Sequence, residues 1–410
     1  MLRPAWLEIN LSALADNVHN LKSVLSPHQL IIAVVKANAY GHGAVPVSRV
    51  AVEAGAGRLA VALVEEAVEL REAGARAGAR GTGPVMCLGA TPAEAAPLLV
   101  EQQIEAPLTD LEGARALAAA ARAAGRTAPV HIKVDTGMHR LGVRPEEIGE
   151  FCAGLRELPG LEIVGIFTHF SSSQIDPEFT LRQLGLFREA VATAETVLGL
   201  RIPLRHVCNS GATVRYPEAW LDAVRPGALL YGIPRDRGGP YLPPMRPVLA
   251  LKAKIAVVKA LRAGESVGYD RTWRAPHDTR LGLLPLGYAD GYDRLLSNRG
   301  EVLVHGRRCP IVGRICMDVT IIDLTGVPAA QVGDTAVLVG EQGGEAVQVH
   351  DLAELCGTVV QEIVSRFSSR LPRVYYAEPG DERVPAALGD KRSMLSDAPV
   401  RERANSGQHG

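Results

Sequence analysis

A single lysine stands where an apolar segment of the chain ends. Residues 30–35 read LIIAVV, and Lys36 follows at once, ahead of the stretch ANAYGHG. Lysine is almost never fully buried unless it has a partner or a chemical function. Its amine can bind an aldehyde covalently as a Schiff base. Taken alone, however, Lys36 is better explained by an aliphatic stem that leaves the core with its amine in water. Its function therefore depends on the rest of the chain.

Two later segments could bind a phosphate. HVCNSGA at 206–212 and AVRPGALLYG at 223–232 each place small residues at or near the end of an apolar run. Backbone N–H groups bind phosphate in this way after the last two strands of many parallel barrels. The residues expected to contribute are Ser210, Gly211, Gly227 and Ala228. A ligand that joins a phosphate to an aldehyde is pyridoxal phosphate, so these segments and the lysine together indicate this cofactor.

The pattern between residues 29 and 232 predicts the elements that position these residues. Short apolar runs alternate with amphipathic segments such as LEGARALAAAARAAG (111–125), which end in glycine as helices do. The alternation favours a parallel (β/α)8 barrel, with an open doubly wound sheet as the alternative. The apolar runs lie near residues 30–35, 59–63, 84–88, 104–107, 129–134, 161–167, 204–208 and 223–230.

The residue pattern of the sequence changes from helix-forming to strand-forming segments after about residue 245. Segments such as GEVLVHGRRCPIVGRICMDVTIIDL (300–324) are rich in Val and Ile and are broken by glycine turns, which predicts β structure. The polar, charged end of the chain is typical of a disordered tail. The predicted organisation is an N-terminal strand joining the β domain (1–11), a cofactor-binding barrel (12–244), a mostly β domain (245–376) and a tail (377–410).

Composition excludes several classes of function. The formal net charge is -1, which gives no reason to expect a nucleic acid or a membrane surface as partner. None of the 6 cysteines forms a C-x-x-C pair, so we expect free thiols in a reducing compartment and no metal site. There is no signal-peptide pattern, and no apolar run approaches the ~20 residues of a membrane span. These features predict a soluble cytoplasmic protein.

Seven motifs together resemble one enzyme family. AVVKANAYGHG (33–43) is similar to the cofactor-lysine motif of the alanine racemases, and KVDTGMHRLG, FTHF, CNSGA, GYADGYDR, GRICMD and SSRLPRVYY follow in that family's order. The resemblance covers roughly residues 3–376. It implies a pyridoxal-phosphate enzyme that interconverts L-alanine and D-alanine by two-base proton transfer at the α-carbon and supplies D-alanine for peptidoglycan. It also implies a homodimer with shared active sites.

The resemblance further implies a role for each matching residue. Lys36 would carry the cofactor and act as the base on one face of the amino acid, and Tyr269 would be the second base, reaching in from the other subunit. Lys133 would be carbamylated and would orient Arg140, and Arg225 would face the pyridine nitrogen. The residues implied to bind the cofactor are Lys36, Tyr40, His169, Asn209, Ser210, Arg225, Gly227 and Ala228. Those implied to bind or admit the substrate are Arg140, Met317 and Tyr288.

This sequence departs from the family's pattern near two of these positions. Gly268 and Asp270 flank Tyr269, where the family often has serine and glycine, and they change the expected backbone and charge around the second base. Ser369 stands where some members have a tyrosine that binds phosphate, and Gln361 stands where a tyrosine is common. The departures predict a changed setting for Tyr269 and a missing phosphate contact.

Simpler explanations exist for single residues and for the whole chain. Taken alone, Lys133 could pair with Asp135, and His169 could be an ordinary core histidine. Alternative functions are a racemase of broader specificity, for example for serine, a decarboxylase of basic amino acids, and a non-catalytic protein that binds pyridoxal phosphate. Arg225 argues against the decarboxylase, which typically has an acidic residue at the pyridine nitrogen. Residues 245–376 argue against the non-catalytic protein, which lacks this second domain.

Overall fold

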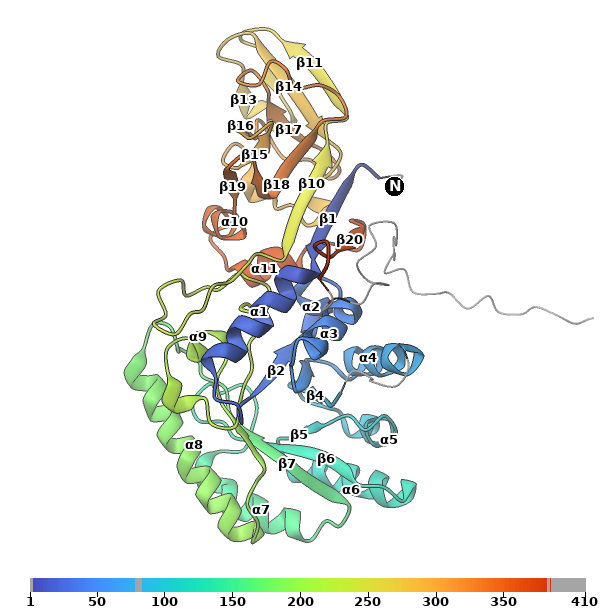
Figure 1. The fold of residues 1–410 in the computed structure, drawn as a ribbon, viewed down its shortest axis with the longest axis vertical. Coiled ribbons are helices and arrows are strands. Elements are labelled where there is room, and N and C mark those ends of the chain that lie inside the picture. Colours follow the sequence, from blue (N-terminus) through green and yellow to red (C-terminus); the bar gives the residue numbers. More distant parts are fainter. Residues whose placement is uncertain (1–2, 78–82, 382–383, 385–410) are drawn as a thin grey trace, which may run out of the picture.

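The computed structural model describes residues 3–77, 83–381 and 384 of the chain. Helices surround one set of strands in the lower part of Figure 1, and a second, sheet-rich part lies above it. Among the described residues, no helix is both long and apolar enough to cross a membrane.

In the lower part, eight parallel strands of the described chain close into a barrel. Their order around the sheet is β4-β3-β2-β9-β8-β7-β6-β5. The two ends of this order meet through a parallel bridge between Met86 and Glu105, and the backbone N–H of Cys87 donates to the Glu105 carbonyl at 2.9 Å. The predicted (β/α)8 barrel is therefore confirmed over the open sheet. The strands are β2 (Leu30–Val34), β3 (Arg58–Val61), β4 (Val85–Cys87), β5 (Ala106–Leu108), β6 (Ala128–Lys133), β7 (Leu161–Phe167), β8 (Leu204–His206) and β9 (Ala223–Val224).

Local sequence explains where the helices around the barrel begin and end. In α6, Asp110 accepts a hydrogen bond from the Gly113 N–H at 2.8 Å, and Gly125 ends the helix in the left-handed conformation, with φ 60°. Its buried face consists of Ala114, Leu117, Ala118 and Ala121, which follow helical periodicity. The helices are α1 (Leu11–Val24), α2 (Lys36–Tyr40), α3 (Ala44–Glu53), α4 (Val64–Ala77), α5 (Ala96–Glu101), α6 (Leu111–Ala124), α7 (Ile148–Arg156), α8 (Pro177–Leu198) and α9 (Ser210–Thr213).

In the described residues, the upper part contains three sheets and two short α-helices. Its largest sheet has the order β16-β15-β18-β10-β1-β20, with β19 beside β18, and the others are β11-β14-β17 and β12-β13. Helices α10 and α11 were not anticipated, because both are too short to show a clear helical period. The elements are β1 (Ala5–Asn10), β10 (Leu249–Lys254), β11 (Val257–Leu261), β12 (Ser266–Val267), β13 (Trp273–Arg274), β14 (Thr279–Leu284), β15 (Glu301–Val304), β16 (Arg307–Pro310), β17 (Thr320–Asp323), β18 (Thr335–Gln342), β19 (Glu345–Val347), α10 (Val349–Cys356), α11 (Val360–Ser365) and β20 (Arg373–Tyr376).

Both ends of the described chain tie the two parts together. Strand β1 pairs antiparallel with β10 and parallel with β20. Helix α11 packs against α2 at the junction (Figure 1), where a Cβ on Gly41 would lie 2.3 Å from the Val364 carbonyl oxygen. Of the expected tail, residues 377–381 and Val384 are described, and Glu378 donates its backbone N–H to the Ser12 hydroxyl at 2.9 Å. The remainder of the tail lies outside the described residues.

Candidate active site

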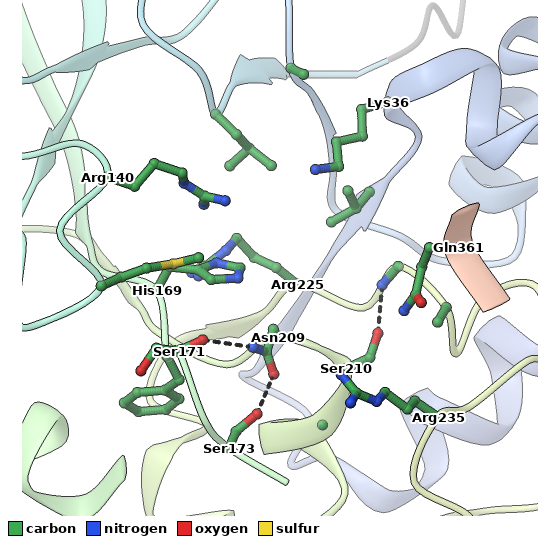
Figure 2. Close-up of a pocket in the computed structure, with 18 of the residues that line it drawn as sticks. Lys36, Arg140, His169, Ser171, Ser173, Asn209, Ser210, Arg225, Arg235 and Gln361 are labelled. Atoms are coloured by element: carbon green, nitrogen blue, oxygen red, sulfur yellow. Dashed lines mark hydrogen bonds between the residues drawn. The ribbon is translucent and has the colours of Figure 1, made fainter. Parts of the chain in front are cut away.

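A cavity of about 480 Å³ lies at the carboxyl ends of the barrel strands. This volume is in the range typical of cofactor and substrate sites. Figure 2 shows the side chains of Lys36, Arg140 and Arg225 converging on it from different elements. The predicted site residues that line the cavity are Lys36, Tyr40, Lys133, Arg140, His169, Asn209, Ser210, Arg225, Gly227 and Ala228.

Lys36 lies at the start of an unusual turn. Residues 37–40 have φ between 51° and 54°, so α2 is a left-handed turn made without glycine. This conformation costs roughly 1–2 kcal/mol per residue, and such strain is concentrated at functional sites. The Glu66 carboxylate holds the turn by accepting the Ala37 N–H at 2.5 Å and the Ala62 N–H at 2.8 Å. The lysine is thereby fixed at the carboxyl end of β2.

The surroundings of Lys36 favour its uncharged amine. Burial lowers the pKa of Lys36, and the positive charge of Arg140 lowers it further, while Glu66 acts in the opposite direction. A larger fraction of Lys36 is therefore unprotonated at neutral pH than of a lysine in water. An unprotonated amine is the form that attacks an aldehyde.

Hydrogen-bond donors gather at one end of the cavity. The Gly227 N–H donates to the Ser210 hydroxyl at 2.9 Å, and a Cβ on Gly227 would lie 2.5 Å from the Tyr40 hydroxyl. Burial raises the pKa of Tyr40 to about 12, which keeps its hydroxyl a donor. Asn209 positions this corner, because its side-chain oxygen accepts from the Ala212 N–H at 3.0 Å. Hydroxyl and N–H donors close together suit the oxygens of a phosphate.

Several hydrogen bonds hold Arg225 in place. Its guanidinium is buried and donates to the carbonyl oxygens of His206, Thr168 and Val207 at 2.8, 2.7 and 3.0 Å, respectively. Nη2 also lies 3.4 Å from His169 Nδ1. Burial lowers the pKa of Arg225 to about 10, so the group remains protonated at neutral pH.

Two more groups beside Arg225 are driven toward their neutral forms. Lys133 is buried, and its pKa is well below the ordinary value because of burial and the charges of Arg225 and Arg140. Its amine lies 4.2 Å from the centre of the Phe167 ring. The pKa of His169 is also well below its usual value, because of burial and then the charge of Arg225. The surroundings therefore favour the uncharged form of both groups.

Three predicted site residues lie elsewhere. Tyr269, Tyr288 and Met317 belong to the upper part, are 69, 42 and 53 % exposed, and do not line the cavity in the described chain. Gly268 has φ 70°, which favours glycine directly before Tyr269. Asp270 pairs with the Arg314 guanidinium at 3.2 Å.

The structure adds Arg235 and Gln361 to the cavity lining. Figure 2 shows both on the side of Ser210, away from Arg140. Gln361 was noted in the sequence only as a departure from the family, and nothing distinguished Arg235. Ser369 is not among the described lining residues. The position that faces the donors near Ser210 is therefore Gln361 of α11.

Comparisons with known proteins agree along nearly the whole chain. The family model described as alanine racemase, N-terminal domain, matches residues 9–234, and that of the C-terminal domain matches residues 248–375. An alanine racemase from Desulfovibrio desulfuricans is 43% identical over 374 residues, covering 91% of this chain and 98% of the relative. An alanine racemase from Clostridium perfringens is 41% identical over 384 residues, covering 91% of this chain and 96% of the relative.

Solved structures give the same result. The crystal structure of alanine racemase from Streptomyces lavendulae has a TM-score of 0.85 and 37% identity, covering 92% of this chain and 98% of that one. The structure of alanine racemase from Bacillus anthracis with bound L-Ala-P has a TM-score of 0.84 and 34% identity, covering 92% of this chain and 95% of that one. The described barrel, the cavity at its mouth and these matches lead to one conclusion: the chain belongs to the alanine racemase family.

Proposed function

We propose that this chain interconverts L-alanine and D-alanine with pyridoxal phosphate, and that the D-alanine supplies cell-wall peptidoglycan. The observation that carries this proposal is the basic lining of the cavity. Five basic side chains line it, three of them arginines, and no Asp or Glu does among the described residues. The phosphate of the cofactor and the carboxylate of alanine are the anions that such a cavity favours. The basic residues are Lys36, Lys133, Arg140, Arg225 and Arg235.

The residues of the site fit the cofactor on which the family depends. Tyr40, Ser210, Gly227 and Ala228 would hold the phosphate, in a corner that a Cβ on Gly227 would fill. Lys36 would bind the aldehyde carbon. When bound, pyridoxal phosphate withdraws electrons from the α-carbon of the amino acid and makes its proton removable.

Lys36, Arg140 and Lys133 would act on the substrate. The lowered pKa of Lys36 supports its role as a base that takes or returns the α-proton on one face. Arg140 would bind the substrate carboxylate. We assign a carbamate to Lys133, formed when its unprotonated amine adds to CO2 and releases a proton. The depressed pKa of Lys133 supplies that amine, and the resulting anion would lie near Arg140 and Arg225.

Arg225 would face the pyridine nitrogen and limit side reactions. Its guanidinium keeps its proton at neutral pH, so it would donate a hydrogen bond to this nitrogen without protonating it. An unprotonated ring is a weaker electron sink, which disfavours transamination. His169, 3.4 Å from Arg225, would lie beside the same ring.

We also propose that the second base comes from another copy of the chain. Tyr269 is largely exposed and lies outside the described cavity lining, so it is not placed to act as a base in the cavity of its own chain. In a head-to-tail homodimer, Tyr269 of the partner subunit would stand on the face opposite Lys36, and its contacts would exclude water. Met317, through its backbone, and Tyr288 would contact the substrate and the entrance. Their segments are joined by a hydrogen bond from the Tyr288 N–H to the Cys316 carbonyl at 3.0 Å.

We assign the reaction to the cytoplasm. All 6 cysteines of the chain are free thiols, as a reducing compartment keeps them.

Two measurements test the proposal. The purified protein loaded with pyridoxal phosphate should convert L-alanine to D-alanine, which chiral chromatography detects. Borohydride reduction should fix the cofactor to the peptide that contains Lys36. Lys259→Ala, at an exposed position of β11, is the control and should leave label and activity unchanged. No D-alanine from the loaded protein would contradict the activity, and a label on another lysine would contradict the assignment of Lys36.

A further inference from the structure

A line of buried polar side chains leads from Arg225 into the interior of the barrel. Arg225 Nη1 lies 2.8 Å from His206 Nδ1, and His206 Nε2 lies 3.1 Å from His131 Nδ1. His131 Nε2 lies 2.9 Å from Glu105 Oε2. Both histidines are 0% exposed and Glu105 is 5% exposed. Glu105, His131 and His206 do not line the cavity. His206 contacts Arg225 directly, and His131 and Glu105 are linked to Arg225 through His206.

The chemistry of the groups fixes which atom donates and which accepts in each hydrogen bond from Arg225 to Glu105. A guanidinium can only donate, so His206 Nδ1 must accept and the proton of its ring lies on Nε2. His131 Nδ1 must then accept, and its Nε2 proton is donated to Glu105. Burial and the charge of Arg225 hold the pKa of His206 well below its usual value, so that ring is neutral. Each ring therefore has a single tautomer.

Glu105 stays ionised at the far end of the line. Burial opposes its ionisation, but the hydrogen bond from His131 and the charge of Arg58 help to hold the pKa of Glu105 below its ordinary value. Arg58 Nη1 lies 3.5 Å from Glu105 Oε1. The carboxylate is thus an acceptor for His131 at neutral pH.

Packing keeps the two imidazole rings in place. Phe167 stacks on His206, with ring centres 5.0 Å apart. A Cβ on Gly165 would lie 2.3 Å from His131 Nδ1, so the absence of a side chain there makes room for the ring. The two rings therefore cannot easily turn to exchange hydrogen-bond partners. What can still change is the ring nitrogen that carries the proton in each histidine.

Removing the acceptor at Glu105 would free both tautomers. His131 could then carry its proton on Nδ1, and His206 Nε2 would have to accept it. The His206 proton would move to Nδ1 and face the Arg225 N–H across the present 2.8 Å. Two donors cannot share that contact, so the guanidinium would have to shift.

We propose that Glu105 is a positioning residue for Arg225, acting through the tautomers of His131 and His206. This inference rests on the proposed function in one respect, namely that Arg225 faces the pyridine nitrogen. With the line intact, Arg225 is held as a fixed donor toward the cavity. With the line broken, Arg225 loosens and side reactions increase.

Three variants of the enzyme loaded with pyridoxal phosphate test this. Glu105→Leu removes the acceptor, Glu105→Gln keeps an acceptor oxygen, and Glu162→Gln changes an exposed carboxylate on β7 as a control. Nitrogen-15 NMR of histidine-labelled enzyme reports which His206 nitrogen carries the proton. We expect mixed tautomers and an at least several-fold larger ratio of transamination to racemisation in Glu105→Leu. Glu105→Gln and the control should resemble the wild type.

The outcomes separate positioning from mere packing. If Glu105→Leu lowers only the melting temperature and leaves the His206 tautomer and the reaction ratio unchanged, the proposal is wrong. It is also wrong if Glu105→Gln behaves like Glu105→Leu. Should Glu105→Leu not fold, His131→Leu breaks the next bond and should mix the His206 tautomers equally. The NMR readout needs no turnover, so an inactive wild type would refute the proposed function and leave this test readable.

Discussion

If the two bases come from different subunits, two inactive variants should restore each other's activity. Lys36→Ala removes the base in the cavity, and Tyr269→Ala removes a side chain that is 69 % exposed and outside the described lining. Each variant homodimer has two defective sites and should be nearly inactive. In a mixed dimer, one site lacks both bases and the other has both.

The expected recovery follows from this count. Random exchange of equal amounts of the two variants gives about half mixed dimers, each with one of its two sites intact. Activity should therefore reach about a quarter of the wild-type value. An excess of either variant lowers the fraction of mixed dimers, so the recovery should peak at equal amounts.

The assay measures D-alanine formed from L-alanine after the variants have exchanged subunits. Different affinity tags allow mixed dimers to be captured and counted by mass. Tyr269→Ala mixed with Tyr269→Phe is the matched control, because every site then lacks the tyrosine hydroxyl. Recovery in the control, or none in the Lys36→Ala and Tyr269→Ala mixture despite verified exchange, would refute a second base supplied by Tyr269 of the partner subunit.

Three further predictions concern the basic residues of the cavity. Arg225→Glu should slow racemisation and raise the share of transamination per turnover, measured as pyruvate formed per D-alanine; unchanged rates would place the arginine away from the ring. Lys133→Ala should lose activity and regain part of it with acetate, whose carboxylate replaces the carbamate, and an intact mass showing unmodified lysine in active enzyme would contradict this. Arg140→Gln removes a charge that lowers the pKa of Lys36, so this pKa should rise. The pH dependence of covalent pyridoxal phosphate uptake by the apoenzyme, followed by absorbance, should then shift to higher pH. A shift to lower pH would contradict this prediction.

The sequence alone carried most of the information about the fold and the composition of the cavity. The alternation of apolar runs and amphipathic segments predicted the barrel, because β periodicity and helix periodicity are local properties of the chain. Lys36, Ser210 and Gly227 each lie at or just beyond the end of a strand, and parallel strands of a barrel bring such residues to one face. That these residues line one cavity could therefore be anticipated without coordinates.

Backbone conformation and long-range contacts were decided only by the tertiary structure. The left-handed turn at residues 37–40 contains no glycine, and contacts with Glu66 hold it in place. Gln361 of α11 lines the cavity, whereas Ser369 is not among the described lining residues. Which of the two residues reaches the cavity depends on how the two parts of the chain pack, and the sequence does not specify this packing.

The buried line behind Arg225 shows most clearly what the sequence could not reveal. Glu105, His131 and His206 come from different strand regions of the barrel. Their side chains meet because the register of parallel strands sets which residues share a layer inside the barrel. A periodic pattern determines that a side chain points inward, but strand register determines which side chain it meets there.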